Sequence, residues 1–140
     1  GNARGPGRIC GDAAALPVAR ASVEACSIAF GLRNVTRRTD ALAEMHRVLK
    51  PGGHFICLEF SPAVLTQLKT IYDTYSFKVL PWLGQRVAGD AESYAYLAES
   101  IRKFPEPEQL ATEMRDAGFG NVTQTPMSGG IVWLHSGWRI

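Results

Sequence analysis

The stretches VEACSIAF, Val23 to Phe30, and HFICLEF, His54 to Phe60, together decide the fold. Both are short, mostly apolar runs with β-branched or aromatic residues, which are typical of strands buried in a sheet. Between them, Thr36 to Leu49 carries apolar residues at helical spacing. The segment KPGG, Lys50 to Gly53, ends this helix, because proline cannot continue one and glycine tolerates a positive φ. Strand, helix, turn and strand form a βαβ unit, which predicts two adjacent parallel strands.

Further along the chain, the sequence predicts more helix and a terminal hairpin. Ala63 to about Phe104 is mostly helical in pattern, with a break around Pro81 to Gly89, and Glu106 to Ala117 is an amphipathic helix. Asn121 to Met127 and Ile131 to Trp138 follow the pattern of two strands, and the loop SGG between them favours a hairpin. We therefore expect an α/β fold that ends in two antiparallel strands.

Composition places the chain among ordinary globular proteins. It has 140 residues, of which 46% are hydrophobic and 20% charged, which suits one domain with a core. The net charge of +2 gives no electrostatic reason to expect a nucleic acid partner. Its apolar runs fall short of a transmembrane helix. The three histidines are far apart in the sequence, and we expect no metal site.

Several blocks of sequence carry more specific information. In chain order they are GDAAALP (11–17), IAFGLRNV (28–35), HRVLKPGGHFICLEFS (46–61), YDTYSFKVLP (72–81), AGDAESYAYLAESIRKFP (88–105) and SGGIVWLHSGWRI (128–140). In this combination and order they resemble the ubiquinone/menaquinone biosynthesis C-methyltransferase family. LKPGG alone is common to many methyltransferases, whereas the combination is specific.

The resemblance implies both a fold and an activity. The fold is a Rossmann-like class I methyltransferase sheet, mostly parallel, with an antiparallel C-terminal hairpin. The activity is S-adenosylmethionine-dependent C-methylation of a polyprenyl benzoquinol or naphthoquinol ring. This sequence has no GxGxG loop after a strand, which such enzymes use to approach the cofactor. We therefore expect residues 1–140 to be the C-terminal portion of a single, N-terminally truncated methyltransferase domain. The alternative is a catalytically inactive fragment that acts as a scaffold or partner in a quinone-biosynthesis complex.

The family pattern also implies a cofactor site. Asp12 would accept a hydrogen bond from the adenine amino group, and the Ala13 N–H would donate to a ring nitrogen. The alternative for Asp12 is a turn residue after Gly11. Ala29, Phe30 and Gly31 complete the expected cofactor-binding set; they end the first strand, at the sheet edge where ligands of parallel sheets bind.

Arg33 and Asn34, which follow in GLRNV, are the expected catalytic residues. A guanidinium is a poor base near neutral pH, so Arg33 would stabilise a phenolate or orient a water molecule that takes the phenol proton. The alternative for Arg33 is a structural salt bridge. Tyr75, Asp90 and Tyr94 are the expected substrate-binding residues. Their alternatives are ordinary roles in helices, such as helix core for Tyr75 and an N-cap for Asp90.

The implied substrate also suggests partners and a location. A polyprenyl tail lies in a bilayer, and Phe77 to Gly89, with Trp82 between basic residues, would either rest on a membrane surface or form a buried lid. A truncated sheet exposes an edge, so a homodimer or a quinone-biosynthesis complex is expected. The location implied is the bacterial cytoplasm, peripheral at the inner membrane. The alternative is the matrix side of the mitochondrial inner membrane.

Overall fold

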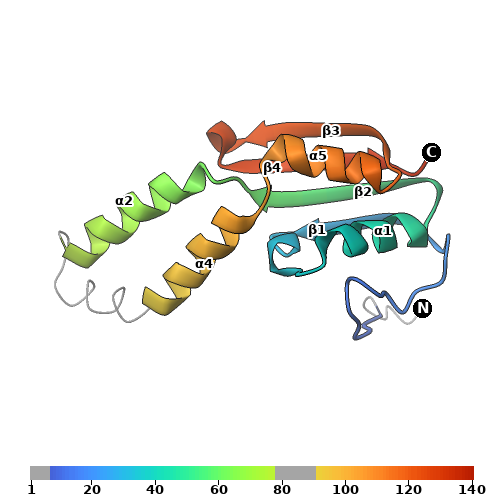
Figure 1. Ribbon diagram of the computed structural model, residues 1–140, viewed down its shortest axis with the longest axis horizontal. Helices are drawn as coiled ribbons and strands as arrows, with labels where there is room; N and C mark the ends of the chain where they lie inside the picture. Colours follow the sequence, from blue (N-terminus) through green and yellow to red (C-terminus); the bar gives the residue numbers. More distant parts are fainter. Residues whose placement is uncertain (1–6, 78–90) are drawn as a thin grey trace, which may run out of the picture.

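The computed structural model describes residues 7–77 and 91–140. Within these ranges it describes the backbone throughout and the side chains of all residues except 71–77 and 91. Figure 1 shows a sheet with helices packed along it and a pair of helices projecting from one end. The described elements are, in chain order, β1 (Val23–Ala29), η1 (Leu32–Asn34), α1 (Arg38–Val48), β2 (Leu49–Phe60), α2 (Val64–Phe77), α4 (Ala91–Lys103), α5 (Pro107–Asp116), β3 (Gly120–Met127), η2 (Ser128–Gly130) and β4 (Val132–Trp138).

The four described strands form one mixed sheet in the order β1-β2-β4-β3. β1 and β2 are adjacent and parallel, with Ile28 paired to Cys57, which confirms the βαβ prediction. β4 runs antiparallel between β2 and β3, so that His135 faces Cys57 on one side and Gln124 on the other. The terminal hairpin is thus confirmed, and its last strand lies inside the sheet rather than at its edge.

The KPGG segment differs from the expected simple turn. Helix α1 ends at Val48, and Leu49 is already extended and paired with Val23. The next pairing joins Ala25 to His54, so the residues between Leu49 and His54 bulge out of β2. Gly52 has a φ of +83°, which favours glycine at the tip of this bulge. The proline and glycines therefore follow the end of the helix, as expected, but they belong to strand β2 rather than to a turn before it.

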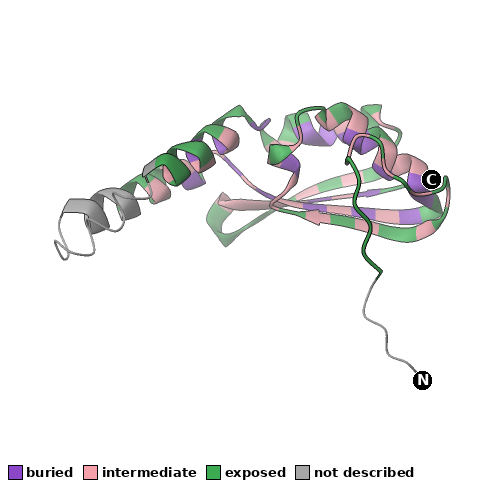
Figure 2. Ribbon diagram, turned by 90° about the horizontal axis from the view of Figure 1, so that it is seen from below, coloured by how far each residue is buried: buried purple, intermediate pink, exposed green. Residues whose placement is uncertain are grey.

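The hydrophobic core lies between one face of the sheet and the helices α1 and α5, which both cover that face (Figure 2). Phe55 of β2 stacks on Phe119, with ring centroids 5.1 Å apart. Other buried members of this cluster are Leu42, Met45, Leu49, Leu110 and Met114. Burying a leucine, methionine or phenylalanine side chain stabilises a fold by about 1.5–3 kcal/mol, so this layer holds α1 and α5 in place.

β1 is less buried than its sequence suggests. Its side chains alternate between half-buried residues that face α1, such as Cys26 and Ile28, and exposed residues on the other face. Those exposed residues are Ala25, Ser27 and Ala29. The expectation of a buried strand is wrong for this face, because α1 and α5 lie on the same side of the sheet. A run of small side chains in a strand does not tell which face is covered.

The remaining two helices form a projection. α2 follows β2 and leads away from the sheet, and α4 returns beside it (Figure 1). The C-terminal half of α4 brings the chain back to η1, which it contacts. In the described part of the chain, no helix has the length and apolar character needed to span a membrane.

Candidate functional site

The candidate site is built on the turn that follows β1. Phe30 has a φ of +55°, which is unusual for a residue other than glycine, and the chain then forms the short helix η1. This turn lies beside the end of β2, because Phe30 N–H donates to the Leu58 carbonyl. Parallel strands end at the same edge of a sheet, so the turn stands where ligands of such sheets bind.

Arg33 on this turn is held by Glu59 at the end of β2. Its Nη1 donates to Glu59 Oε1 at 3.0 Å and to the Phe30 carbonyl at 2.5 Å, and its backbone N–H donates to Glu59 Oε2 at 3.2 Å. The Glu59 side chain is only 2% exposed and that of Arg33 14%. The salt bridge considered as an alternative for Arg33 thus exists, with a partner on β2.

Although its side chain is largely buried in this ion pair, Arg33 also lines a hollow. Arg33 and Asn34 line a hollow of about 300 Å³ between η1 and α4, here called the Arg33 hollow. The other lining residues are Val35, Thr36, Tyr96, Glu99, Ser100 and Lys103. The Tyr96 hydroxyl donates to Asn34 Oδ1 at 3.2 Å and joins α4 to η1. The walls therefore carry cationic, hydroxyl and amide groups together with the carboxylate of Glu99.

A second hollow of about 370 Å³ shares part of this lining and is called the Asp12 hollow. It is lined by Gly11, Asp12, Ala13, Ala14, Asn34, Val35, Thr36 and Arg37. Asp12 Oδ1 accepts the Ala14 N–H at 2.8 Å, and the Asp12 carbonyl accepts the Ala15 N–H at 2.9 Å. Asp12 is thus a turn residue, the alternative considered for it in the sequence, and it also lines a hollow of ligand size.

Asn34, Val35 and Thr36 line both hollows. A ligand in one hollow would therefore lie next to a ligand in the other. Such an arrangement suits the transfer of a small group between two bound molecules, because it holds them in one orientation.

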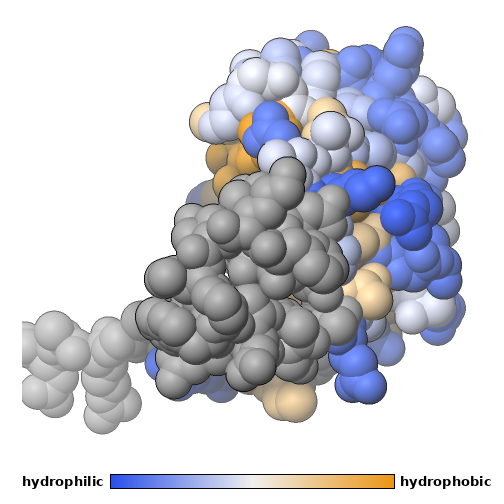
Figure 3. All heavy atoms as spheres, turned by 90° about the vertical axis from the view of Figure 1, so that its left-hand side faces the viewer, coloured by the Kyte–Doolittle hydropathy of each residue, from blue (hydrophilic) through white to orange (hydrophobic). Residues whose placement is uncertain are grey.

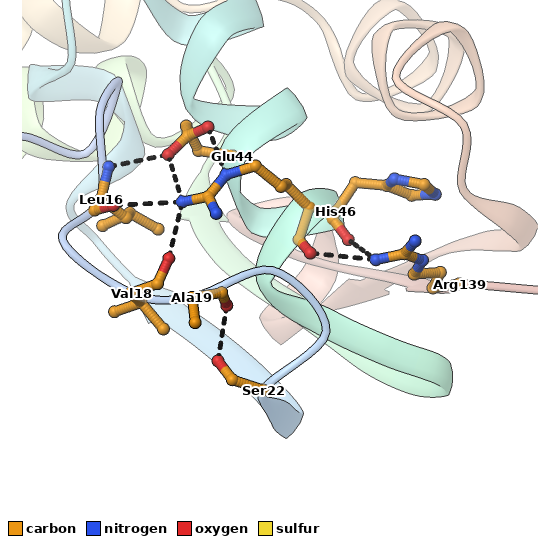
Figure 4. Close-up of polar contacts among 8 residues, drawn as sticks. Leu16, Val18, Ala19, Ser22, Glu44, His46 and Arg139 are labelled. Atoms are coloured by element: carbon orange, nitrogen blue, oxygen red, sulfur yellow. Dashed lines mark hydrogen bonds and ion pairs between the residues drawn. The ribbon is translucent and has the colours of Figure 1, made fainter.

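The segment that follows the N-terminal residues of the Asp12 hollow, Leu16 to Val18, is held by α1 (Figure 4). Arg47 Nη2 donates to the Leu16 carbonyl at 3.1 Å and to the Val18 carbonyl at 2.8 Å. Glu44 Oε2 accepts the Leu16 N–H at 2.8 Å, and its hydrogen bond with Arg47 keeps the pKa of Glu44 below its usual value. Arg139 caps the end of α1 by donating to the backbone carbonyls of His46, Arg47 and Leu49.

The other residues expected at the cofactor site lie beside the hollows rather than in their walls. Ala29 is exposed on the open face of the sheet. The Phe30 ring packs against Phe60, with centroids 4.6 Å apart, and Gly31 precedes η1. Phe30 and Gly31 shape the turn that carries Arg33; direct contact of Ala29, Phe30 and Gly31 with a cofactor stays a prediction.

The expected substrate residues are only partly described. Tyr94 lies on α4 and is half-buried, whereas Tyr96, two residues later, is the tyrosine that lines the Arg33 hollow. Tyr75 lies on α2 at a position whose side chain is outside the described ones, and Asp90 is outside the described residues, as is most of Phe77 to Gly89. Among the side chains that are described, no group of three or more His, Cys, Asp or Glu is arranged to hold a metal ion.

Glu59, which holds Arg33, and Tyr96, which lines the Arg33 hollow, are among the site residues that sequence reasoning missed. Glu59 was signalled by its chemistry, since it is the one acid in the apolar stretch HFICLEF. Tyr96 had no such signal, because its place depends on how α4 packs against η1. His135, by contrast, lies buried away from both hollows, where its Nε2 is 2.8 Å from the Pro107 carbonyl.

Comparison with known proteins adds a family to this geometry. The model of the ubiE/COQ5 methyltransferase family matches residues 7–139. The ubiquinone/menaquinone biosynthesis C-methyltransferase of Nitrobacter hamburgensis is 58% identical over 130 residues, which are 93% of this chain and 51% of that relative. The protein of the same name from Paracoccus denitrificans is 54% identical over 132 residues, 94% of this chain and 53% of the relative. The chain thus spans about half the length of these relatives.

Solved structures agree on the fold. An S-adenosylmethionine-dependent methyltransferase from Thermotoga maritima superposes with a TM-score of 0.60 at 20% identity, over 93% of this chain and 62% of that one. Another from Aquifex aeolicus gives a TM-score of 0.59 at 14% identity, over 94% of this chain and 54% of that one. The Rossmann-like class I methyltransferase fold expected from the sequence is confirmed.

Proposed function

This chain belongs to the ubiE/COQ5 methyltransferase family, and we propose that the protein transfers the methyl group of S-adenosylmethionine to a ring carbon of a polyprenyl benzoquinol or naphthoquinol in ubiquinone or menaquinone biosynthesis. The names of its relatives support this reaction. The structural observation that carries it is the pair of hollows that share Asn34, Val35 and Thr36. One hollow would hold the methyl donor and the other the methyl acceptor.

The Asp12 hollow suits the adenosine part of the cofactor. The bond from Ala14 N–H fixes the Asp12 carboxylate but uses only part of its accepting capacity, so the exposed carboxylate can accept from an adenine amino group. Its size of about 370 Å³ falls in the range of small-molecule sites. The cofactor supplies an electrophilic methyl group on its sulfonium, and the protein has to hold and orient it.

The Arg33 hollow suits the quinol ring. Arg33 stabilises a phenolate oxygen by charge and hydrogen bonding, and the phenolate charge spreads to the ring carbon that attacks the methyl group. With the cofactor bound, the ring carbon would form a carbon–carbon bond to the methyl group as the sulfonium releases it, and that ring carbon would then lose its proton. Because Arg33 stays protonated, the phenol proton leaves to water or to another base.

We further propose the bacterial cytoplasm, peripheral at the inner membrane, as the location, with the matrix side of the mitochondrial inner membrane as the alternative. A substrate with a polyprenyl tail supports contact with a bilayer surface. In Figure 3, which faces the projecting end of the molecule, the described surface mixes hydrophilic side chains with small apolar patches. Within the described sheet β1 pairs on one side only, with β2, which supports a homodimer or a larger complex through its other edge.

Two measurements on the purified protein test the proposed reaction. Calorimetry measures the affinity for S-adenosylmethionine, and a labelled methyl group reports transfer to a short-tail demethylated quinol kept in its reduced form. Saturable cofactor binding together with label in the quinol supports the proposal. Cofactor binding without transfer contradicts it, and the absence of both would instead favour an inactive scaffold.

A further inference from the structure

Glu59 is a buried acid that the reaction just described does not use. Its carboxylate, 2% exposed, accepts N–H groups from the Arg33 backbone, the Arg33 guanidinium and the Phe60 backbone. We propose that Glu59 is a positioning residue, which fixes the Arg33 guanidinium so that its remaining N–H groups bind the phenolate oxygen of the methyl acceptor. This inference rests on the proposed function and assigns a role within the same site.

The two carboxylate oxygens of Glu59 act on different parts of Arg33. Oε2 accepts the backbone N–H at 3.2 Å and so holds the η1 turn, while Oε1 accepts Nη1 at 3.0 Å and holds the guanidinium. The Phe30 carbonyl accepts from the same Nη1. Below the guanidinium, the Phe60 ring centroid lies 5.8 Å from the Arg33 Cζ. The side chain is therefore fixed by hydrogen bonds on one edge and by a ring on one face.

The opposite edge of the guanidinium keeps donors for a ligand. A guanidinium carries five N–H donors, and both Glu59 Oε1 and the Phe30 carbonyl accept from the same nitrogen, Nη1. In the described part of the chain, the buried Arg33 Nε–H has no acceptor, which is costly unless a ligand or water supplies one. A phenolate oxygen in the Arg33 hollow is an acceptor of the required charge.

A positioning role and a purely electrostatic role of Glu59 predict opposite results. If Glu59 only reduced the positive charge of Arg33, its neutralisation would strengthen the binding of an anion. If Glu59 positions Arg33, Glu59→Gln weakens binding in spite of the more positive site. The glutamine NH₂ would then face a group that is itself a donor, either Arg33 or the Phe60 N–H, and the turn cannot keep its geometry.

The experiment titrates the protein with 4-nitrophenol, whose anion absorbs in the visible range, without cofactor and across a pH series. The wild type should bind the anion better than the neutral phenol and thereby lower the apparent pKa of the bound probe. Glu59→Gln should weaken binding of the anion about tenfold, the loss typical of a hydrogen bond to a charged group, and should make the lowering of the probe pKa smaller. Glu113→Gln is the matched control, because Glu113 forms a half-buried ion pair with Arg38 and neither residue lines either hollow; it should leave the pH profile unchanged.

Every outcome decides the proposal. Anion binding that is equal or stronger in Glu59→Gln overturns it, as does a wild type that does not bind the probe. If Glu59→Gln does not fold, Glu59→Asp is measured instead: weaker binding supports the role, and unchanged binding overturns it. If neither variant folds, Glu59 is structural and the proposal fails. Since the assay needs no methyl transfer, a failure of the proposed reaction would be seen separately.

Discussion

The Arg33 guanidinium and the Glu59 carboxylate form a buried ion pair, with Nη1 and Oε1 3.0 Å apart, that joins the turn after β1 to the end of β2. The two residues are 26 positions apart in the sequence. Their pairing ties the fold to the candidate site, because the parallel register of β1 and β2 brings them together and one of them lines a hollow. Changes at this pair should therefore affect both stability and function.

Replacing Arg33 by alanine should destabilise the protein markedly. The change leaves Glu59 buried without its charged partner, and removing one member of a buried pair costs about 3–5 kcal/mol. Arg33→Ala combined with Glu59→Gln should recover part of this loss, because no unpaired charge remains. Urea unfolding measures the free energy of unfolding of the single and the double variant. An Arg33→Ala variant as stable as the wild type would mean that the pair is effectively solvated.

Where Arg33→Lys folds, it should be a poor replacement in methyl transfer. Lysine keeps the charge but lacks the planar fork, so it cannot contact Glu59 and a phenolate together. Turnover should fall by about 10²-fold, as for the loss of an electrostatic donor, with cofactor affinity little changed. Full turnover in Arg33→Lys would show that only the charge matters.

Asp12→Ala should weaken the affinity for S-adenosylmethionine with less effect on turnover at saturating cofactor. Asp12→Asn separates the two roles of this residue, because its amide oxygen can still accept the Ala14 N–H while the charge is lost. Calorimetry should then give an intermediate affinity. The control is Glu24→Ala, an exposed residue paired with Lys50 outside both hollows. Equal affinities in wild type and Asp12→Ala would place the adenosine elsewhere.

Tyr96→Phe should loosen the Arg33 hollow. The change removes the hydrogen bond to Asn34 Oδ1 that joins α4 to η1, which contributes about 0.5–1.5 kcal/mol. We expect the KM for the quinol to rise several-fold, with the affinity for S-adenosylmethionine less affected. Thr112→Val, which removes an exposed hydroxyl from α5, is the control. A KM unchanged in Tyr96→Phe would show that the substrate does not reach α4.

Unfolding free energy should fall as the pH drops below about 6.5, the ordinary pKa of histidine. Burial lowers the pKa of His135 in the folded protein, and it does the same for His46. The unfolded chain therefore binds protons at a pH where the folded one does not, and stability declines through this window down to the folded-state pKa values. Urea unfolding of His135→Leu between pH 7.5 and 5 should show a smaller decline than wild type, with the His46 contribution remaining. If the unfolding free energy fell equally steeply with pH in wild type and in His135→Leu, the role of His135 would be contradicted.

Much of the fold could be predicted because its signals are local. The apolar stretches of β1 and β2, with a helix between them, sufficed to predict a parallel pair. The SGG loop likewise predicted the hairpin of β3 and β4. The bulge after Leu49 could not be predicted, because it depends on which residue of β1 each residue of β2 meets. The open face of β1 was missed for a similar reason, since small side chains suit covered and uncovered faces alike.

The candidate site was predictable in its chemistry more than in its contacts. Arg33, Asn34 and Asp12 were named from the blocks that carry them, and the structure brings all three to the walls of the two hollows. The partner of Arg33 and the choice of Tyr96 over Tyr94 both depend on tertiary packing. Neither the register of two strands nor the rotation of α4 against η1 can be read from a local pattern.

The central claim is that two neighbouring ligand sites share the segment Asn34, Val35 and Thr36. The most direct measurement is an amide ¹H–¹⁵N NMR titration of the protein with S-adenosylmethionine, followed by a short-tail quinol. The account predicts that the cofactor shifts the amide signals of residues 12–14 and 34–36, and that the quinol then shifts those of residues 33–36 and 96–103. Cofactor-induced shifts confined to other parts of the chain, or a quinol that leaves residues 33–36 unaffected, would contradict it.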